Sequence, residues 1–169
     1  MDKVLKFYEV DASYIKYLSK FDSKVPKVDY SASSQHDKFL CGIVLSINRY
    51  NYFAPISSFI IPQLTNIIIK NERGEDLSSI RFSFMIPIPD GVATIKNISR
   101  EPSEKYRRLL NWELRFCMKN ANAIFRKAKH VYNTVICGKD PLMIKNCYDF
   151  KTLEAACFEY MSITPSADA

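Results

Sequence analysis

The fold is decided by a β-hairpin encoded at residues 39–54, which read FLCGIVLSINRYNYFA. The first arm, Phe39–Ile47, is a continuous apolar run of the kind that forms buried strands. The chain turns at Asn48-Arg49, and Tyr50–Ala54 returns as the antiparallel partner. Proline cannot donate a backbone hydrogen bond, so we expect Pro55 to end this second strand.

Further short strands flank this hairpin, and most of the helices follow them. We expect strands at Val4–Val10, Thr65–Lys70, Ile80–Ile88 and Val92–Ile95, a polar turn at Asn71–Leu77, and short helices from Asp11 to Leu18 and at Phe150–Met161. This order indicates an α+β fold with an antiparallel sheet. No repeat or linker divides the chain, so we expect residues 1–169 to form one domain with a frayed tail at 162–169.

The region 103–137 is predicted to be both helical and basic. Ser103 is a suitable N-cap and Gly138 a suitable stop, and a break near Lys119–Asn122 would divide an unusually long helix. Apolar residues recur at helical spacing on one face: Tyr106, Leu110, Cys117, Ala121, Ile124, Ala128, Val131 and Val135. The opposite face carries Lys105, Arg108, Arg115, Lys119, Asn122, Arg126 and Lys129, which we call the basic stripe. Its single sign of charge favours phosphate binding over a plain solvated surface.

The charge of the whole chain also points to a polyanionic partner. The 169 residues include 24 Lys+Arg and 18 Asp+Glu, a net charge of +6. Residues 96–151 alone hold thirteen basic and five acidic side chains. No apolar run approaches the roughly 20 residues of a membrane span, and the first residues lack the apolar segment of a secretory signal. We therefore expect a cytoplasmic protein that does not enter membranes and that binds nucleic acid or another anionic surface.

Familiar catalytic and metal-binding motifs are absent from the sequence. It contains no P-loop, zinc-protease, serine-hydrolase or dinucleotide-binding motif. The five cysteines are scattered without a Cys-x-x-Cys pair and are interpreted as small buried hydrophobes. Glu72, Glu75 and Asp76 surround a glycine turn, which favours a solvated hairpin over a metal site. We expect neither a metal nor a cofactor.

Polar side chains cluster instead at the open end of the hairpin. Tyr30, His36 and Lys38 precede its first strand, and Ser57 and Ser58 follow the second. The two ends of an antiparallel hairpin lie side by side, so these groups can converge. Such a set suits RNA cleavage without metal, in which the 2′-OH attacks the neighbouring phosphorus. The protein then removes a proton, stabilises charge on the phosphate and protonates the leaving 5′-oxygen.

Several blocks of this sequence resemble the ToxN/AbiQ family of endoribonuclease toxins. The blocks lie at residues 6–8, 14–18, 21–26, 38–45, 52–58, 84–88 and 106–110, and they include Lys38-Phe39-Leu40 and Ala54-Pro55-Ile56-Ser57-Ser58. Together they span most of residues 6–135 in the family's order and at roughly its spacing. The resemblance implies a strongly twisted antiparallel sheet flanked by helices, related to the MazF/Kid toxins.

The resemblance also implies a function and partners. Family members are toxins of type III toxin–antitoxin systems that cleave RNA without metal and leave 2′,3′-cyclic phosphate and 5′-OH ends. Their inhibitor is a small repeated antitoxin RNA, folded as a pseudoknot in a closed protein–RNA assembly, which the toxins can process from its precursor. Several confer abortive infection against phage. The implied substrates are cellular mRNAs, and no DNA partner is expected.

Position by position, the resemblance assigns catalytic roles to Lys38, to the pair Ser57-Ser58 and to Tyr30. Family members usually continue Thr-Ser-Pro-Lys, whereas this chain reads Ser57-Ser58-Phe59-Ile60 and lacks the second lysine. Either Lys38 acts with Tyr30 or His36, or another base such as Lys27 substitutes, or activity is reduced. The missing lysine also keeps open the hypothesis of a non-catalytic RNA-binding module. A third hypothesis is an interaction protein whose basic helix docks an acidic protein.

Overall fold

The hairpin of residues 39–54 forms the centre of the sheet in the computed structural model, which describes residues 4–26 and 39–164. Its strands are β2 (Leu40–Ile47) and β3 (Tyr50–Ser57). The turn residues Asn48 and Arg49 both have positive φ, 50° and 70°. This geometry is typical of the two-residue turns whose twist matches a right-twisted hairpin. The predicted turn is confirmed.

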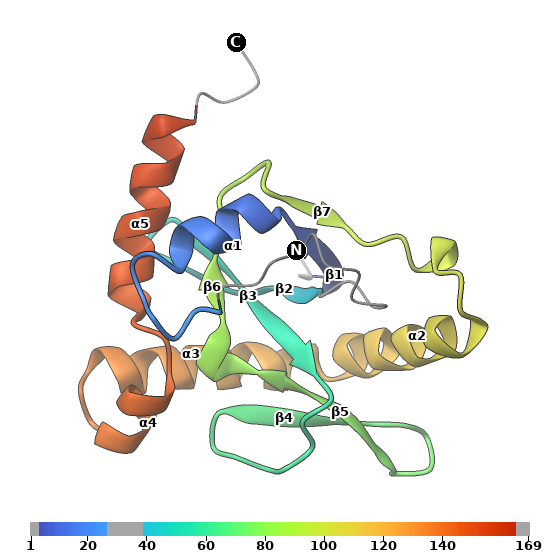
Figure 1. Cartoon of the computed structure of the whole chain (residues 1–169). Helices are drawn as coiled ribbons and strands as arrows, with labels where there is room; N and C mark the ends of the chain where they lie inside the picture. Colours follow the sequence, from blue (N-terminus) through green and yellow to red (C-terminus); the bar gives the residue numbers. More distant parts are fainter. Residues whose placement is uncertain (1–3, 27–38, 165–169) are drawn as a thin grey trace.

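The described strands form one sheet in which all neighbours are antiparallel (Figure 1). The other strands are β1 (Lys6–Val10), β4 (Asn66–Lys70), β5 (Asp76–Arg81), β6 (Ile86–Pro87) and β7 (Ala93–Ile95). Their order is β4-β5-β3-β2-β1-β7, and β6 also pairs with β3. The α+β class with an antiparallel sheet is therefore confirmed.

Pro55 does not end its strand, and that prediction is wrong. β3 continues to Ser57, with Pro55 opposite Leu40 of β2. On the other side of β3, β6 pairs with Tyr52 and Phe53, and β5 pairs only from Ile56 onward. Proline thus occupies a position with one neighbouring strand, where a missing amide hydrogen is tolerated.

The predicted strand Ile80–Ile88 is also wrong, because it is divided into three elements. β5 begins earlier, at Asp76, and the 3₁₀ helix η1 (Phe82–Phe84) separates it from β6. The hydrophobic pattern does not indicate the start of β5, because buried serines stand there in place of apolar residues. The Ser78 hydroxyl donates to Glu113 Oε1 at 2.6 Å, and the Ser79 hydroxyl donates to the Phe59 carbonyl at 2.5 Å.

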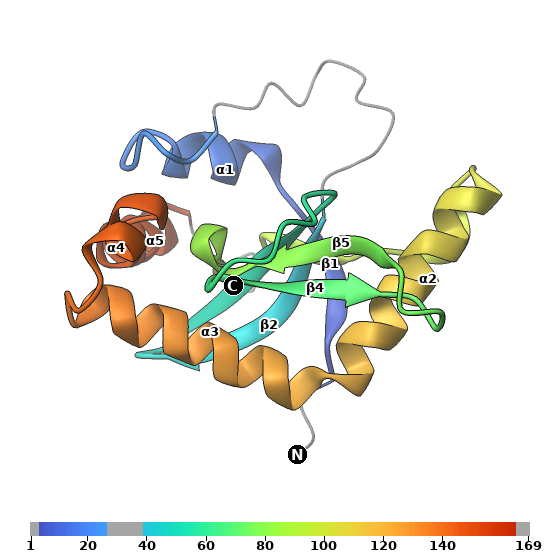
Figure 2. The same ribbon diagram turned by 90° about the horizontal axis from the view of Figure 1, so that it is seen from below.

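Helices cover both sides of the sheet (Figure 2). The helix α1 (Ala12–Leu18) lies on one side, and α2 (Glu104–Lys119) and α3 (Ala121–Ile136) lie on the other. The Ser103 hydroxyl accepts the Tyr106 amide hydrogen at 3.2 Å and caps α2, and the chain bends at Asn120 between the two helices. The predicted cap and break are confirmed.

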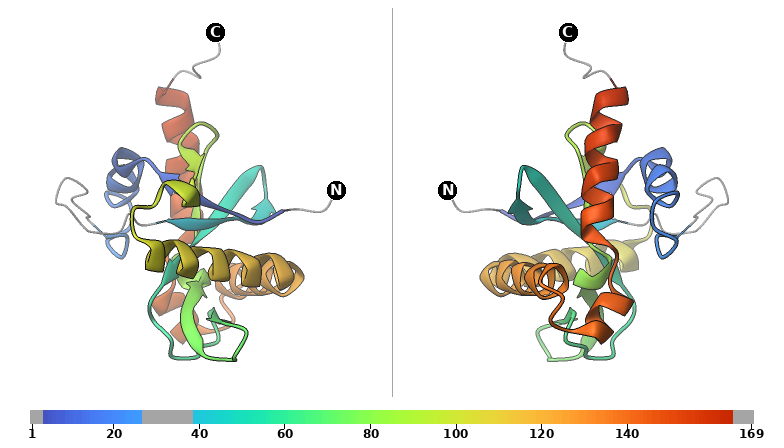
Figure 3. Two further views of the ribbon diagram at one scale, coloured as in Figure 1. Left: turned by 90° about the vertical axis from the view of Figure 1, so that its right-hand side faces the viewer. Right: turned by 90° about the vertical axis from the view of Figure 1, so that its left-hand side faces the viewer.

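Two further helices complete the described chain. The short α4 (Pro141–Asn146) was not predicted, and α5 (Phe150–Ile163) extends two residues beyond the predicted end at Met161. α5 packs against β6, α1 and α3, and its C-terminal end projects beyond them (Figure 3). Within residues 4–26 and 39–164, no helix combines the length and apolar character that crossing a bilayer requires.

One buried feature holds the sheet to the helices, and a second holds two strands of the sheet together. The Glu154 carboxylate of α5 accepts the hydroxyls of Tyr52 (2.7 Å) and Tyr132 (2.6 Å), which come from β3 and α3, and Lys151 donates to it at 3.1 Å. In β2, Gly42 lies against the ring of Phe53, where an added Cβ would be only 2.1 Å from Cδ1. Only glycine fits at this position without movement of the ring.

Candidate active site

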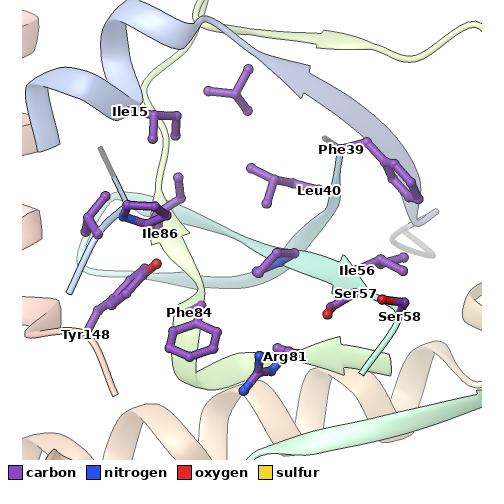
Figure 4. A pocket seen from close by; sticks show the side chains of 14 residues that line it. Ile15, Phe39, Leu40, Ile56, Ser57, Ser58, Arg81, Phe84, Ile86 and Tyr148 are labelled. Atoms are coloured by element: carbon purple, nitrogen blue, oxygen red, sulfur yellow. The ribbon is translucent and has the colours of Figure 1, made fainter. Parts of the chain in front are cut away.

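The end of β3 opens into a pocket of about 400 Å³. Ser57 is half-buried and Ser58 is exposed, and both line the pocket. Its walls are largely apolar and include Phe39, Pro55, Ile56, Phe84, Ile86 and Tyr148. In Figure 4, the serines lie at one end of the pocket and Tyr148 at the other. A concave, mostly apolar site with a few polar groups is the usual form of a ligand-binding site.

The Ser57 hydroxyl is oriented by its own turn. Its Oγ accepts the amide hydrogen of Phe59 at 3.2 Å. This acceptor role leaves the hydroxyl hydrogen available to donate to a bound oxygen. The pocket therefore presents hydroxyl groups at the open end of the hairpin, as the sequence predicts.

Other predicted catalytic residues cannot be placed. Tyr30, His36 and Lys38, together with Lys27, lie outside the described residues. The chain resumes at Phe39, which lines the same pocket as the two serines. The convergence of Ser57 and Ser58 with the residues before β2 stays a prediction.

Sequence reasoning missed Arg81, the cationic side chain among the described residues that line the pocket. Its guanidinium carbon lies 4.5 Å from the centre of the Phe59 ring and 4.3 Å from that of Phe84. Burial lowers the pKa of this guanidinium below its ordinary value. The sequence signal that could have identified Arg81 is a single arginine between apolar residues, in Ile80-Arg81-Phe82, just before the family block at residues 84–88.

The basic stripe is solvent-exposed along its whole length. Its first four residues belong to α2 and its last three to α3. Five apolar residues of the opposite face, Leu110, Cys117, Ile124, Ala128 and Val131, are buried as predicted. None of the seven stripe residues lines the serine pocket. An RNA that contacts both regions must therefore extend beyond the pocket.

The acidic turn between β4 and β5 is organised by local contacts. Asp76 pairs with Lys70, and the Glu75 carboxylate accepts the Asn71 side-chain amide at 2.6 Å. In the part of the chain that the structure describes, no three His, Cys, Asp or Glu side chains gather as a metal site would require. Of the cysteines, Cys41, Cys117, Cys147 and Cys157 are buried, and Cys137 is exposed.

The sequence profile of the toxin ToxN of type III toxin–antitoxin systems matches residues 6–157. The chain belongs to this ToxN family. It is 32% identical over 147 residues to the endoribonuclease ToxN of Pectobacterium atrosepticum. The aligned region covers 80% of this chain and 84% of that protein.

Two solved structures of the ToxN family share the fold. One comes from work on selective toxin inhibition by a non-coding RNA pseudoknot; it has a TM-score of 0.83 at 25% identity, over 94% of this chain and 98% of that one. The other is AbiQ, a lactococcal anti-phage endoribonuclease of the type III systems, with a TM-score of 0.82 at 25% identity, over 95% and 99% of the two chains.

Phe59 and Ile60 directly follow the serine pair, at the positions where the family resemblance leads us to expect proline and lysine. The Phe59 ring contacts Arg81, and Ile60 is 43% exposed. The residue directly after the serine pair therefore contacts the cation of the pocket.

Proposed function

We propose that this chain is the endoribonuclease toxin of a type III toxin–antitoxin system and that it cleaves RNA at the Ser57–Ser58 pocket. The observation that carries this proposal is the match to the ToxN family over residues 6–157, together with a pocket at the serine pair. Cellular mRNAs are the proposed substrates. The cytoplasm, where mRNA is found, is the proposed place of action.

The proposed reaction is an internal displacement at phosphorus. The 2′-oxygen bonds to the neighbouring phosphorus as its proton is removed, and the bond from phosphorus to the 5′-oxygen breaks. The leaving oxygen takes up a proton, which gives one 2′,3′-cyclic phosphate end and one 5′-OH end. The proton acceptor and donor are proposed among Lys38, His36 and Tyr30, because histidine, lysine and tyrosine are side chains that take part in general acid–base catalysis.

The serine hydroxyls have a separate role in this proposal. Negative charge grows on the non-bridging phosphate oxygens as the 2′-oxygen attacks. Donors held in place before the reaction stabilise that charge without having to reorganise. Ser57, oriented by the Phe59 amide, and Ser58 at the pocket mouth are suited to donate to these oxygens.

The basic stripe is proposed to bind RNA backbone, including that of an antitoxin RNA. Its exposed cations can contact phosphates in any sequence, which gives affinity without base recognition. We further propose that a repeated RNA pseudoknot inhibits the toxin in a closed assembly, that the toxin processes its precursor, and that release of the toxin protects against phage. The anti-phage role of the relative AbiQ supports the last point.

The test of this function is digestion of RNA by the purified wild-type protein in EDTA, followed by analysis of the product ends. Cleavage that leaves cyclic-phosphate ends is the expected result. Cleavage that requires a divalent cation would contradict the proposed chemistry. Intact RNA that remains bound to the protein would instead favour the non-catalytic RNA-binding module.

A further inference from the structure

The guanidinium of Arg81 is held between two aromatic rings, and one of its N–H groups is left without a hydrogen-bond partner among the described residues. Its contacts with Phe59 and Phe84 are made to the faces of aromatic rings, which supply no lone pair to its N–H groups. Arg81 Nε is buried and has no hydrogen-bond partner among the described residues. No acidic side chain of residues 4–26 or 39–164 forms an ion pair with it.

An unpaired cation of this kind is unfavourable unless something else satisfies it. A buried donor without a partner lowers stability, and such groups in folded proteins usually have a functional explanation. Lys96, a buried cation directly after β7, shows the contrast, because its ammonium contacts both Glu9 and Glu101. Arg81 therefore points to an anionic ligand that the protein itself does not provide.

The register of the sheet places Arg81 next to the serine pair. Ser57 of β3 is paired with Ser79 of β5, and Arg81 is two residues further along β5. Alternate residues of a strand share a face, so Ser57 and Arg81 project from the same face as diagonal neighbours. Both line the same pocket, and Figure 4 shows them along one of its sides.

We propose that Arg81 is a substrate-binding residue of this active site, which donates to the non-bridging oxygens of the scissile phosphate. This inference rests on the proposed endoribonuclease function and deepens it. Arginine is suited to the role because its planar fork of N–H groups matches two phosphate oxygens. A guanidinium also stays protonated at neutral pH.

Arg81 thereby supplies the positive charge that this chain lacks at position 60. Ile60 stands at the position of the family's second lysine, and the preceding residue, Phe59, packs its ring against Arg81. The ring of Phe59 thus holds an arginine in the pocket, next to an uncharged residue at position 60.

The test compares Arg81→Gln, Arg81→Lys and a matched control, Arg100→Gln, at an exposed arginine outside both the pocket and the basic stripe. The substrate is an RNA oligonucleotide that contains a site mapped with the wild-type protein. Single-turnover cleavage is measured in EDTA. Binding is measured with the same oligonucleotide carrying a 2′-deoxy nucleotide in place of the attacking 2′-OH.

Removal of one preorganised donor should lower the cleavage rate of Arg81→Gln by about 100-fold, because the interaction strengthens as charge develops. Binding of the 2′-deoxy RNA should change by less than about tenfold, since phosphate contacts elsewhere supply most of the affinity. Arg81→Lys should retain part of the rate, and Arg100→Gln should match the wild type. Adding Ile60→Lys to Arg81→Gln should restore part of the lost rate.

A phosphorothioate at the scissile phosphate separates direct contact from a structural role. Sulfur in place of a non-bridging oxygen should slow the wild type more than it slows Arg81→Lys, a variant that keeps the charge and the long stem. An equal sulfur effect in both proteins would overturn the proposal, as would an Arg81→Gln rate within about twofold of the wild type. Failure of the wild type itself to cleave would refute the proposed function instead. If Arg81→Gln does not fold, the sulfur effect in Arg81→Lys decides.

Discussion

Glu113 is a buried carboxyl group that should make the stability of this protein depend on pH near neutrality. It lies on α2 with a side chain that is only 3% exposed, and the Ser78 hydroxyl donates to it at 2.6 Å. Burial raises the pKa of Glu113 from 4.5 to about 7, although the Ser78 hydrogen bond opposes the rise. The substitution that tests this environment is Glu113→Gln, which keeps the size and the acceptor oxygen but removes the titration.

The sign follows from the two pKa values. Below pH 4.5 the carboxyl is neutral in both the folded and the unfolded chain, so this group has no effect on stability. As the pH rises to about 7, the unfolded chain releases the proton more readily than the folded one, and the free energy of unfolding falls. The pKa difference corresponds to a loss of about 3 kcal/mol, complete once the pH exceeds the folded pKa.

The measurement is urea unfolding of both proteins, followed by circular dichroism at constant ionic strength from about pH 5 to pH 8. Relative to the wild type, Glu113→Gln should gain up to about 3 kcal/mol of unfolding free energy across this range. The control is Glu72→Gln at an exposed carboxylate, which should show no such trend. A difference between Glu113→Gln and wild type that does not vary with pH would refute the reasoning.

Three other predictions concern the fold and the RNA-binding surface. Gly42→Ala should lower the urea midpoint at unchanged m-value, because the new Cβ would clash with the Phe53 ring. The free energy of unfolding should fall by about 1–3 kcal/mol or more. Unchanged stability would contradict the close approach of Gly42 to Phe53. Tyr52→Phe should lower the unfolding free energy by about 2 kcal/mol, because it removes a hydrogen bond to the buried Glu154 carboxylate. The control is Tyr50→Phe, at a partly buried tyrosine of the same strand. Equal losses of unfolding free energy in the two variants would count against the Tyr52–Glu154 bond. Arg115→Gln should weaken RNA binding and reduce the slope of log K against log salt by about one, measured by fluorescence anisotropy, whereas an unchanged slope would exclude a phosphate contact at Arg115.

Much of the fold was predictable because local signals agreed with the final structure. The turn at Asn48-Arg49, the cap at Ser103 and the amphipathic pattern of 103–137 are each encoded within a few residues. The helix break also fell where it was expected, at Asn120. At these places, tertiary contacts reinforce what the sequence already favours.

The errors have a common physical cause, because each depends on a distant partner. Ser78 and Ser79 are buried in β5 since their hydroxyls find Glu113 and Phe59, and no hydrophobic pattern marks them. Pro55 stays within β3 because it lies between the segments of β3 that pair with β6 and with β5, where no amide hydrogen is needed on that side. Neither arrangement can be seen in a window of adjacent residues.

The candidate site was predictable in part for the same reason. Ser57 and Ser58 follow a strand and match a family motif, so sequence alone identifies them. Other residues of the pocket come from segments far from that motif, namely Arg81, Phe84 and Tyr148. The sheet topology brings Arg81 and Phe84 to the pocket, and the segment before α5 brings Tyr148. Single residues of this kind become candidates once the fold shows which of them face the same cavity.

The central claim is that RNA is cleaved at the end of β3, and single-turnover cleavage by Ser58→Ala tests it most directly. The matched control is Ser162→Ala, an exposed serine on α5 outside the pocket. We predict that Ser58→Ala cleaves about 100-fold more slowly than wild type while it still binds the 2′-deoxy RNA, and that Ser162→Ala is unaffected. Equal cleavage rates for the two variants would contradict the assignment of this pocket as the active site.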